Sequence, residues 1–264
     1  MSGRAADGAG GEGPRPGAEG DWYAEYVGHA YRSAVGRTLA AAGGGPPRVL
    51  KTDLWDETLG GARDILGDLA ARRASWCTGI DLELSVCLGA RARVAGLRAV
   101  QADIRALPFR SGSFDAVLDL STLDHVPEAD SASATAEYGR VLRDGGVLLL
   151  VFWQRNLLVR LRLAVKRWLG RSEKPDQHYL SRRAVLAGLG GELGAGRAFV
   201  AGSLLVAPLP LVRSVLRALP AAAAARFVRW VVSCEVSGSM QPLLRSIAGL
   251  YGLQAHRLPR PAKP

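Results

Sequence analysis

The sequence predicts an α/β protein built on a doubly wound, mostly parallel sheet. Between residues 48 and 153, short apolar segments alternate with segments of helical periodicity, as in a parallel sheet with helices on its faces. The apolar segments are continuous rather than interrupted by polar residues, as expected for strands buried on both faces. Acidic or small polar residues follow four of these segments, at the edge where such sheets bind ligands.

The chain before this alternation is predicted to form a tail and one helix. Residues 1–20 include seven glycines and no apolar run, so we expect a disordered tail and no secretory signal peptide. A helical pattern covers residues 21–42 and ends at a Gly/Pro-rich stretch. Residues 21–47 are therefore expected to form an N-terminal helical cover for a single domain that spans residues 48–264.

The elements of that domain follow in order along the chain. Five strands are expected at residues 48–54, 75–81, 97–102, 114–120 and 146–153. The helices between them are expected at residues 57–71, 83–95 and 128–142. After Trp153 the strict alternation ends. We expect helices at residues 156–169, 181–193, 209–219 and 221–232, and strands at residues 197–206 and 247–257.

Size and composition indicate one globular, cysteine-poor domain. The chain has 264 residues, 48% of them hydrophobic, which is enough for one core and marginal for two domains. Cys77, Cys87 and Cys234 argue against a disulfide scaffold, and also against a metal site, because structural zinc needs four ligands at short spacings. The longest uncharged apolar window, residues 198–212, is shorter than the about 20 residues of a membrane span. We therefore expect a reduced, cytoplasmic protein.

Charge is divided unevenly between the two halves of the chain. Residues 1–150 carry 16 basic and 20 acidic side chains, whereas residues 151–264 carry 18 basic and 4 acidic ones. The formal net charge of +10 therefore comes from the second half. Most of the basic residues are arginines. Either the coding composition explains this excess of arginine, or the second half of the chain faces an anionic partner. Nucleic acid is not the favoured partner, because we find no basic stripe that is rich in aromatic residues.

Carboxylates and small polar residues follow the first four predicted strands. They are Asp53 to Glu57, Asp81, Asp103, and Asp119 to Ser121. Each one alone is explained as a helix cap or a turn residue. Because the carboxyl ends of parallel strands meet at one edge of the sheet, we expect all four sets to line the same crevice.

The charge at this crevice distinguishes two classes of nucleotide ligand. A dinucleotide site needs a Gly-rich turn after the first strand, and here the carboxylates of Asp53, Asp56 and Glu57 stand in its place. Each of them would repel a pyrophosphate by about 4 kcal/mol at 4 Å and an effective dielectric constant of about 20. S-adenosylmethionine has no phosphate, and its ammonium, sulfonium, ribose diol and adenine amine all complement carboxylates. The pattern favours S-adenosylmethionine and argues against a nicotinamide oxidoreductase.

Three sequence motifs carry a resemblance to a known family. They are GID at 79–81, ADIRALPFRSGSFDAVLDLSTLDHV at 102–126, and RVLRDGGVLLLVF at 140–152. With them, the chain resembles the Rossmann-like (class I) S-adenosylmethionine-dependent methyltransferases over about residues 45–155. The resemblance implies a mostly parallel seven-stranded sheet with an antiparallel last strand at residues 247–257. It also implies a cofactor-binding core at 48–153 and an acceptor-pocket or lid elaboration at 154–247.

The resemblance implies cofactor contacts at three strand ends. Asp81 would accept both ribose hydroxyls, with Leu82 beside it. Asp103 would accept the adenine amine, and Ile104 would flank the adenine ring. Asp119, Leu120 and Ser121 would lie beneath the sulfonium.

The first motif departs from the family pattern. The family has a strand followed by a Gly-rich turn, whereas this chain has KTDLWDE at 51–57, with Trp55 where a small residue is expected. It is similar to a variant subgroup in which Asp53 and Glu57 hold the methionine end of the cofactor, and we expect Asp56 to be a solvated cap. The alternative is a non-catalytic adenosyl-binding or partner-binding module with a degenerate site.

Two histidines are candidates for the catalytic base. Methyl transfer is an in-line displacement, and a base is needed only when the acceptor must first lose a proton. His125 follows the fourth strand, near the expected position of the methyl group, although it could instead bond locally at the next helix. His178 precedes a later helix on the expected acceptor side. We therefore expect an S-adenosylmethionine-dependent methyltransferase that acts on an apolar or anionic small molecule.

The helix expected at residues 156–169 is basic and amphipathic. Leu157, Leu161, Val165 and Trp168 share one of its faces. This face either packs on the sheet or, together with residues 209–230, forms a lid that receives the acceptor at a membrane surface. A peripheral membrane contact is therefore one of the expected interactions.

Overall fold

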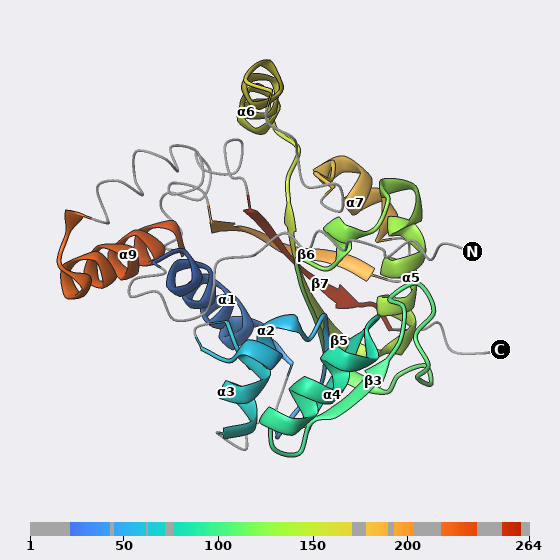
Figure 1. The fold of residues 1–264 in the computed structure, drawn as a ribbon. Coiled ribbons are helices and arrows are strands. Elements are labelled where there is room, and N and C mark those ends of the chain that lie inside the picture. The colour runs from blue at the N-terminus through green and yellow to red at the C-terminus, as the bar shows by residue number, and fades with distance from the viewer. Residues whose placement is uncertain are drawn as a thin grey trace, which may run out of the picture.

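The computed structural model has a seven-stranded sheet at its centre, with strand order β3-β2-β1-β4-β5-β7-β6 (Figure 1). The structure describes residues 22–42, 45–61, 63–71, 76–170, 178–189, 193–202, 218–236 and 250–259. The expected tail at residues 1–20 and most of the expected helix at 209–219 lie outside these ranges. The order, with neighbours that are distant in sequence, is that of the doubly wound fold the sequence predicts.

Five strands run parallel and two antiparallel strands complete the sheet. The parallel strands are β1 (Arg48–Thr52), β2 (Trp76–Asp81), β3 (Arg98–Gln101), β4 (Phe114–Leu120) and β5 (Leu142–Trp153). β7 (Leu250–Arg257) pairs antiparallel with β5 and with β6 (Leu193–Gly202). The antiparallel end of the sheet is thus confirmed. β6 starts four residues earlier than expected.

Helices lie on both faces of the sheet. They are α1 (Trp22–Ala41), α2 (Trp55–Leu59), α3 (Ile65–Ala71), α4 (Leu84–Arg93), α5 (Ser131–Val141), α6 (Leu157–Trp168), α7 (Arg182–Gly188) and α9 (Ala221–Val236). The single helix expected at residues 57–71 is wrong, because α2 and α3 are separate. Gly60 and Gly61 have φ angles of 72° and 85°, which lie in the left-handed region and end an α-helix.

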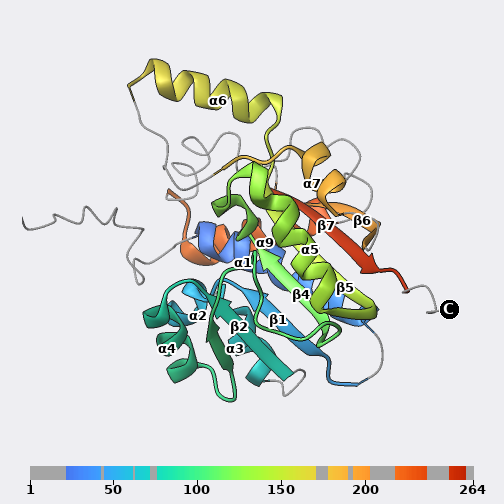
Figure 2. The same ribbon diagram turned by 90° about the vertical axis from the view of Figure 1, so that its right-hand side faces the viewer.

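Two of the three apolar clusters found among the described residues hold α1, α9, α5 and α7 on the sheet. On one face, Tyr26 and Val35 of α1 and Val228 of α9 pack against strand residues such as Leu118 and Val151. The second of these clusters joins α5 and α7 to the opposite side chains of the same strands. Figure 2 shows α1 and α9 on one side of the strands and α5 on the other.

Helix α6 differs from the other helices in its packing. It projects from the end of β5 beyond the sheet (Figures 1 and 2), and its Val159 and Leu163 are buried. Leu157, Leu161, Val165 and Trp168 are exposed. The expectation that this face packs on the sheet is therefore wrong. Among the described residues, no helix is long and apolar enough to cross a membrane.

Candidate active site

The candidate site lies at the carboxyl edge, which we define as the edge where β1, β2 and β4 end at Thr52, Asp81 and Leu120. The parallel register pairs Thr52 with Ile80, so the turns after β1 and β2 are neighbours. The turn after β3 also lies here, because the Ala102 amide donates to the Asp81 carbonyl oxygen at 2.9 Å. The predicted convergence of strand ends is therefore present.

Asp81 links two of these turns through its carboxylate. Oδ2 accepts a hydrogen bond from the Leu54 amide and Oδ1 accepts one from the Glu83 amide, both at 2.9 Å. The side chain is partly exposed. Since each carboxylate oxygen has two lone pairs, both oxygens keep capacity for a further donor.

Gly79 explains how the first turn reaches Asp81. A Cβ atom at this position would lie 2.3 Å from Cδ2 of Leu54, whose side chain is completely buried. The absence of a side chain at Gly79 therefore makes room for Leu54, and the Leu54 amide can then donate to Asp81. This packing gives a physical reason for the glycine of the GID motif.

Asp103 is held by a neighbouring arginine. Nη2 of Arg105 donates to Oδ2 of Asp103 at 2.7 Å, while Nη1 of Arg105 donates to Asp130 at 2.9 Å. These hydrogen bonds from Arg105 hold the pKa of Asp103 below its usual value. Asp103 is therefore anionic and partly exposed at neutral pH, with Ile104 buried beside it.

The turn after β1 contains a buried ion pair. Nζ of Lys51 donates to Oε2 of Glu57 at 2.8 Å, and it also donates to the backbone oxygen of Asp53. Oε1 of Glu57 accepts from the Leu66 amide at 3.3 Å. Glu57 has no exposed surface, so the expectation that its carboxylate faces the cofactor is corrected. Glu57 instead neutralises Lys51 and ties α2 to α3.

The pairing with Glu57 keeps the buried Lys51 protonated. Burial alone would lower the pKa of Lys51, but the charge and hydrogen bond of Glu57, with a smaller contribution from Asp53, raise it above its usual value. Lys51 was not singled out in the sequence. The sequence does contain a signal for this ion pair, which is a lysine inside an apolar strand with a glutamate six residues later. A buried charge requires a partner of opposite charge.

Asp53 stays at the carboxyl edge while Glu57 turns inward. Its φ angle is 60°, and its Oδ1 accepts from the Trp55 amide at 2.8 Å at the start of α2. Trp55 is exposed beside it. Asp56 is not the solvated cap that we expected, because it forms an ion pair with Arg63 at 3.0 Å and burial raises its pKa.

Asp119 is fully buried and does not line the carboxyl edge, contrary to the expectation that it lies beneath the sulfonium. Tyr138 donates to its Oδ2 at 2.7 Å, and the Thr122 amide donates to its Oδ1 at 2.8 Å. Burial is the main cause that raises the pKa of Asp119 to about 6. This carboxylate stabilises the turn after β4, in which Ser121 has a φ angle of 70°.

We expect Asp119→Asn to remove a pH dependence of stability. The pKa is raised to about 6 from 3.8, so the folded protein binds this proton more tightly than the unfolded chain. The stabilisation is therefore fully present below pH 4 and is lost as the pH rises through 6, by about 3 kcal/mol. Urea unfolding of both proteins between pH 4 and 7.5 measures this difference. The same slope in the variant would contradict the assignment.

Helix α1 also contacts the turn after β4. The Tyr31 hydroxyl and Oγ of Ser121 lie 3.0 Å apart, although 90 residues separate them in the sequence. Thr52 and Thr122 also share a hydrogen bond of 2.6 Å between their hydroxyls. Leu120 is buried next to Ser121, so of the three predicted residues in this turn Ser121 is the one that is partly exposed. Tyr31 was missed in the sequence because no local pattern marks such a distant contact.

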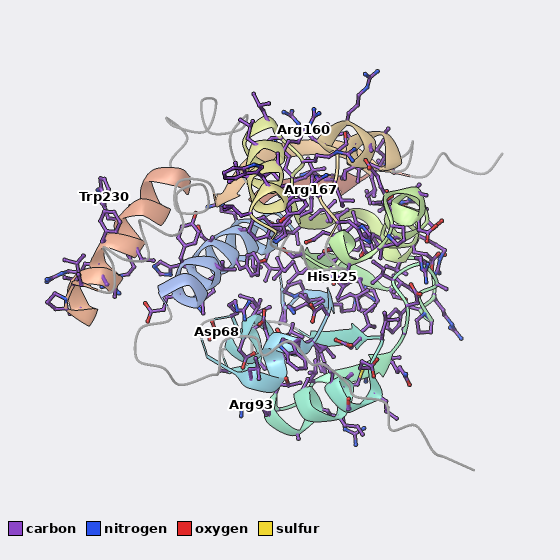
Figure 3. The ribbon with its side chains drawn as sticks, turned by 45° about the horizontal axis from the view of Figure 1, so that its top comes forward. Asp68, Arg93, His125, Arg160, Arg167 and Trp230 are labelled. Carbon is purple, nitrogen blue, oxygen red and sulfur yellow. The ribbon has the colours of Figure 1, made fainter. Side chains whose placement is uncertain are left out.

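The two candidate histidines lie on adjacent segments. His125 is exposed at the end of a short helical turn, Leu123–His125, near the middle of the view in Figure 3. The His178 amide donates to the Asp124 backbone oxygen at 2.6 Å. The structure thus brings together two positions that are 53 residues apart, close to the turn after β4. No cluster of potential metal ligands occurs among the described residues.

Comparisons with known proteins agree with this geometry. The strand order and the antiparallel last strand match the Rossmann-like fold of solved methyltransferases. Residues 59–150 match the family described as "Methyltransferase domain". Over this segment, which runs from the end of α2 to β5, the chain is similar to that family.

One curated relative matches part of the chain. It is a malonyl-[acyl-carrier protein] O-methyltransferase from Enterobacter lignolyticus (strain SCF1), 37% identical over 122 residues. The match covers 44% of this chain and 45% of the relative, so the chain spans less than half the length of that relative.

Solved structures share the fold at low sequence identity. Geranyl diphosphate C-methyltransferase from Streptomyces coelicolor A3(2) has a TM-score of 0.54 and 16% identity, over 86% of this chain and 78% of that one. The MccD protein has a TM-score of 0.54 and 13% identity, over 86% and 96%. The [4+2]-cyclase SpnF also has a TM-score of 0.54, with 16% identity over 88% and 80%. These similarities concern the fold.

Proposed function

We propose that this protein is an S-adenosylmethionine-dependent methyltransferase that transfers a methyl group to a small-molecule acceptor. The observation that carries the proposal is the carboxylate of Asp81. It lies at the carboxyl edge within the segment that matches the methyltransferase family, and backbone amides orient both of its oxygens. When bound, the cofactor would supply an electrophilic methyl group on its sulfonium.

The residues at the carboxyl edge fit this cofactor in charge and polarity. Asp81 retains lone pairs for ribose hydroxyls, and the anionic Asp103 retains exposed surface for an adenine amine. Leu82, which follows Asp81, is exposed and offers apolar surface to the adenine ring, whereas Ile104, which follows Asp103, is buried. A pyrophosphate fits poorly, because Glu57 already neutralises the buried Lys51 and Asp53 is acidic.

The methionine end is assigned to the turn that contains Asp53. Of the three acidic residues in the turn after β1, Asp53 is the one whose carboxylate stays at the carboxyl edge. Glu57 is buried, and Asp56 pairs with Arg63. In this proposal Lys51 and Glu57 are positioning residues. They hold the Asp53 backbone oxygen and the start of α2, in place of the glycine turn of the family.

The acceptor is proposed to be an anionic or amphiphilic small molecule. The second half of the chain carries 18 basic and 4 acidic residues, which favours an anionic acceptor. Two of the similar proteins are named for acceptors with anionic groups, malonyl-[acyl-carrier protein] and geranyl diphosphate. We propose to measure S-adenosylhomocysteine release in the presence of acyl thioesters, carboxylic acids and prenyl diphosphates.

His125 is proposed as the general base, with His178 as the second candidate. A positioned base contributes about 10²–10⁴-fold when the acceptor must lose a proton. We therefore expect His125→Ala to lower kcat by about 100-fold or more and to leave cofactor affinity unchanged. His256→Ala is the matched control, because His256 pairs with Val147, six residues before β5 ends at the carboxyl edge. Full activity of His125→Ala together with loss in His178→Ala would move the role to His178.

A non-catalytic adenosyl-binding module is the second candidate. It is favoured by the turn after β1, where an ion pair replaces glycines, and by the occurrence of this fold in a protein described as a [4+2]-cyclase. The two candidates differ in one product. A methyltransferase releases S-adenosylhomocysteine in proportion to methylated acceptor, whereas a binding module retains S-adenosylmethionine unchanged with every acceptor tested.

A further inference from the structure

Helix α6 presents an apolar face to solvent rather than to the protein. Leu157 is 68% exposed and Trp168 is 84% exposed, and Leu161 and Val165 between them are also exposed. Of the α6 side chains that the structure describes, Val159 and Leu163 are buried. Four large apolar side chains in one row are unusual on a protein surface and indicate an interaction site.

The geometry of the helix separates this face from the body. At about 100° per residue, the exposed row and the pair Val159 and Leu163 lie on opposite sides of the helix. Asn156 caps the start, where its Oδ1 accepts from the Val159 amide at 2.9 Å. The helix is therefore anchored by one side and by its N-terminus, and its apolar row faces outward.

Basic residues accompany the apolar row of α6. Arg160 and Arg167 are exposed and follow one flank, as Figure 3 shows on α6. The sequence adds two further basic residues to this helix, Arg162 and Lys166. No acidic residue occurs in the sequence from position 145 to position 172. The segment therefore combines an apolar row with positive charge alone.

We propose that α6 binds the surface of an anionic lipid bilayer, lying in the interfacial plane. In this orientation the apolar row would enter the boundary between headgroups and acyl chains, and the basic residues would meet anionic headgroups. Charge complementarity and the flat, one-sided row both favour a bilayer. A second copy of the chain is disfavoured, because pairing two such helices would bring their basic residues together.

This contact would orient the candidate site. β5 runs parallel to β4, so it also ends, at Trp153, at the carboxyl edge of the sheet. α6 begins four residues later, at Leu157. Binding through α6 therefore turns that edge toward the lipid headgroups. The proposal is independent of methyl transfer, because it concerns binding of the full chain to vesicles.

The test is flotation of the full chain with two kinds of vesicle, one of phosphatidylcholine and one containing 30% phosphatidylglycerol. We expect binding to the anionic vesicles that weakens with salt. Since each cationic residue near the surface contributes about fivefold to affinity, Arg160→Ala/Arg167→Ala should weaken binding by roughly 30-fold. Leu161→Ser/Trp168→Ser should abolish it through loss of apolar insertion.

Two matched controls separate this site from general charge. Arg91→Ala/Arg98→Ala removes the same charge from exposed positions in α4 and β3, and Trp76→Ser removes an exposed tryptophan from the start of β2. Both should bind as the wild type does. Circular dichroism should show equal folding of all variants. Three results would overturn the proposal: no vesicle binding, equal loss in the charge control, or binding that survives Leu161→Ser/Trp168→Ser.

Discussion

Lys51→Met is expected to lower the free energy of unfolding by about 3–5 kcal/mol, because it leaves the buried Glu57 carboxylate without its counter-charge. Glu57 has no exposed surface, and Lys51 is its salt-bridge partner at 2.8 Å. The variant also loses the hydrogen bond that Lys51 gives to the Asp53 backbone oxygen. Urea unfolding at pH 7 measures the change.

The double variant Lys51→Met/Glu57→Leu tests the cause of this loss. Removing both charges eliminates the orphan carboxylate, so we expect most of the stability to return. A part should stay lost, because the Leu66 amide no longer has Oε1 of Glu57 as its acceptor. Arg32→Met is the control, since Arg32 forms a partly exposed and longer pair with Asp68 at 3.6 Å and should change stability by less than about 1 kcal/mol. A loss in Lys51→Met no larger than in this control would contradict the account.

Asp81→Ala is expected to weaken cofactor binding by about 30- to 150-fold, or about 2–3 kcal/mol. Hydrogen bonds to a charged group contribute about 1.5–3 kcal/mol each and do not add fully. The variant also frees the Leu54 and Glu83 amides, so the turns after β1 and β2 lose a common anchor. Isothermal titration with S-adenosylmethionine measures the change in Kd.

Two further variants separate lost contact from lost structure. Asp81→Asn keeps one acceptor oxygen for a backbone amide, so it should retain more stability while still losing affinity. Asp68→Ala removes a carboxylate from α3 and should leave the Kd unchanged. Unchanged binding by Asp81→Ala would show that the ribose assignment is wrong.

The fold was largely predictable because its strands are buried on both faces. Such strands appear in the sequence as continuous runs of apolar residues. β4, for example, has the predicted bounds, Phe114–Leu120. The prediction failed where single residues control the backbone. Gly60 and Gly61 divide one expected helix into two. β5 starts four residues early at Leu142, which pairs with Phe114 before a register shift.

The site was predictable in its location and only partly in its contacts. Strand order and chain direction bring Asp81 and Asp103 to the carboxyl edge, and this follows from the sequence pattern. The direction of each side chain does not follow from it. Glu57 and Asp119 were expected in the site, yet both point into the protein, where Lys51 and Tyr138 bind them. These partners come from packing, which a linear pattern does not encode.

The measurement that tests the central claim most directly is isothermal titration of the full chain with S-adenosylmethionine and with S-adenosylhomocysteine. The account predicts saturable one-to-one binding of both, weakened by about 30- to 150-fold in Asp81→Ala and unchanged in Asp68→Ala. A reduced nicotinamide dinucleotide should give no binding, because the turn after β1 is acidic and lacks glycines. Absence of binding by both adenosyl compounds, in a folded protein, would contradict the account.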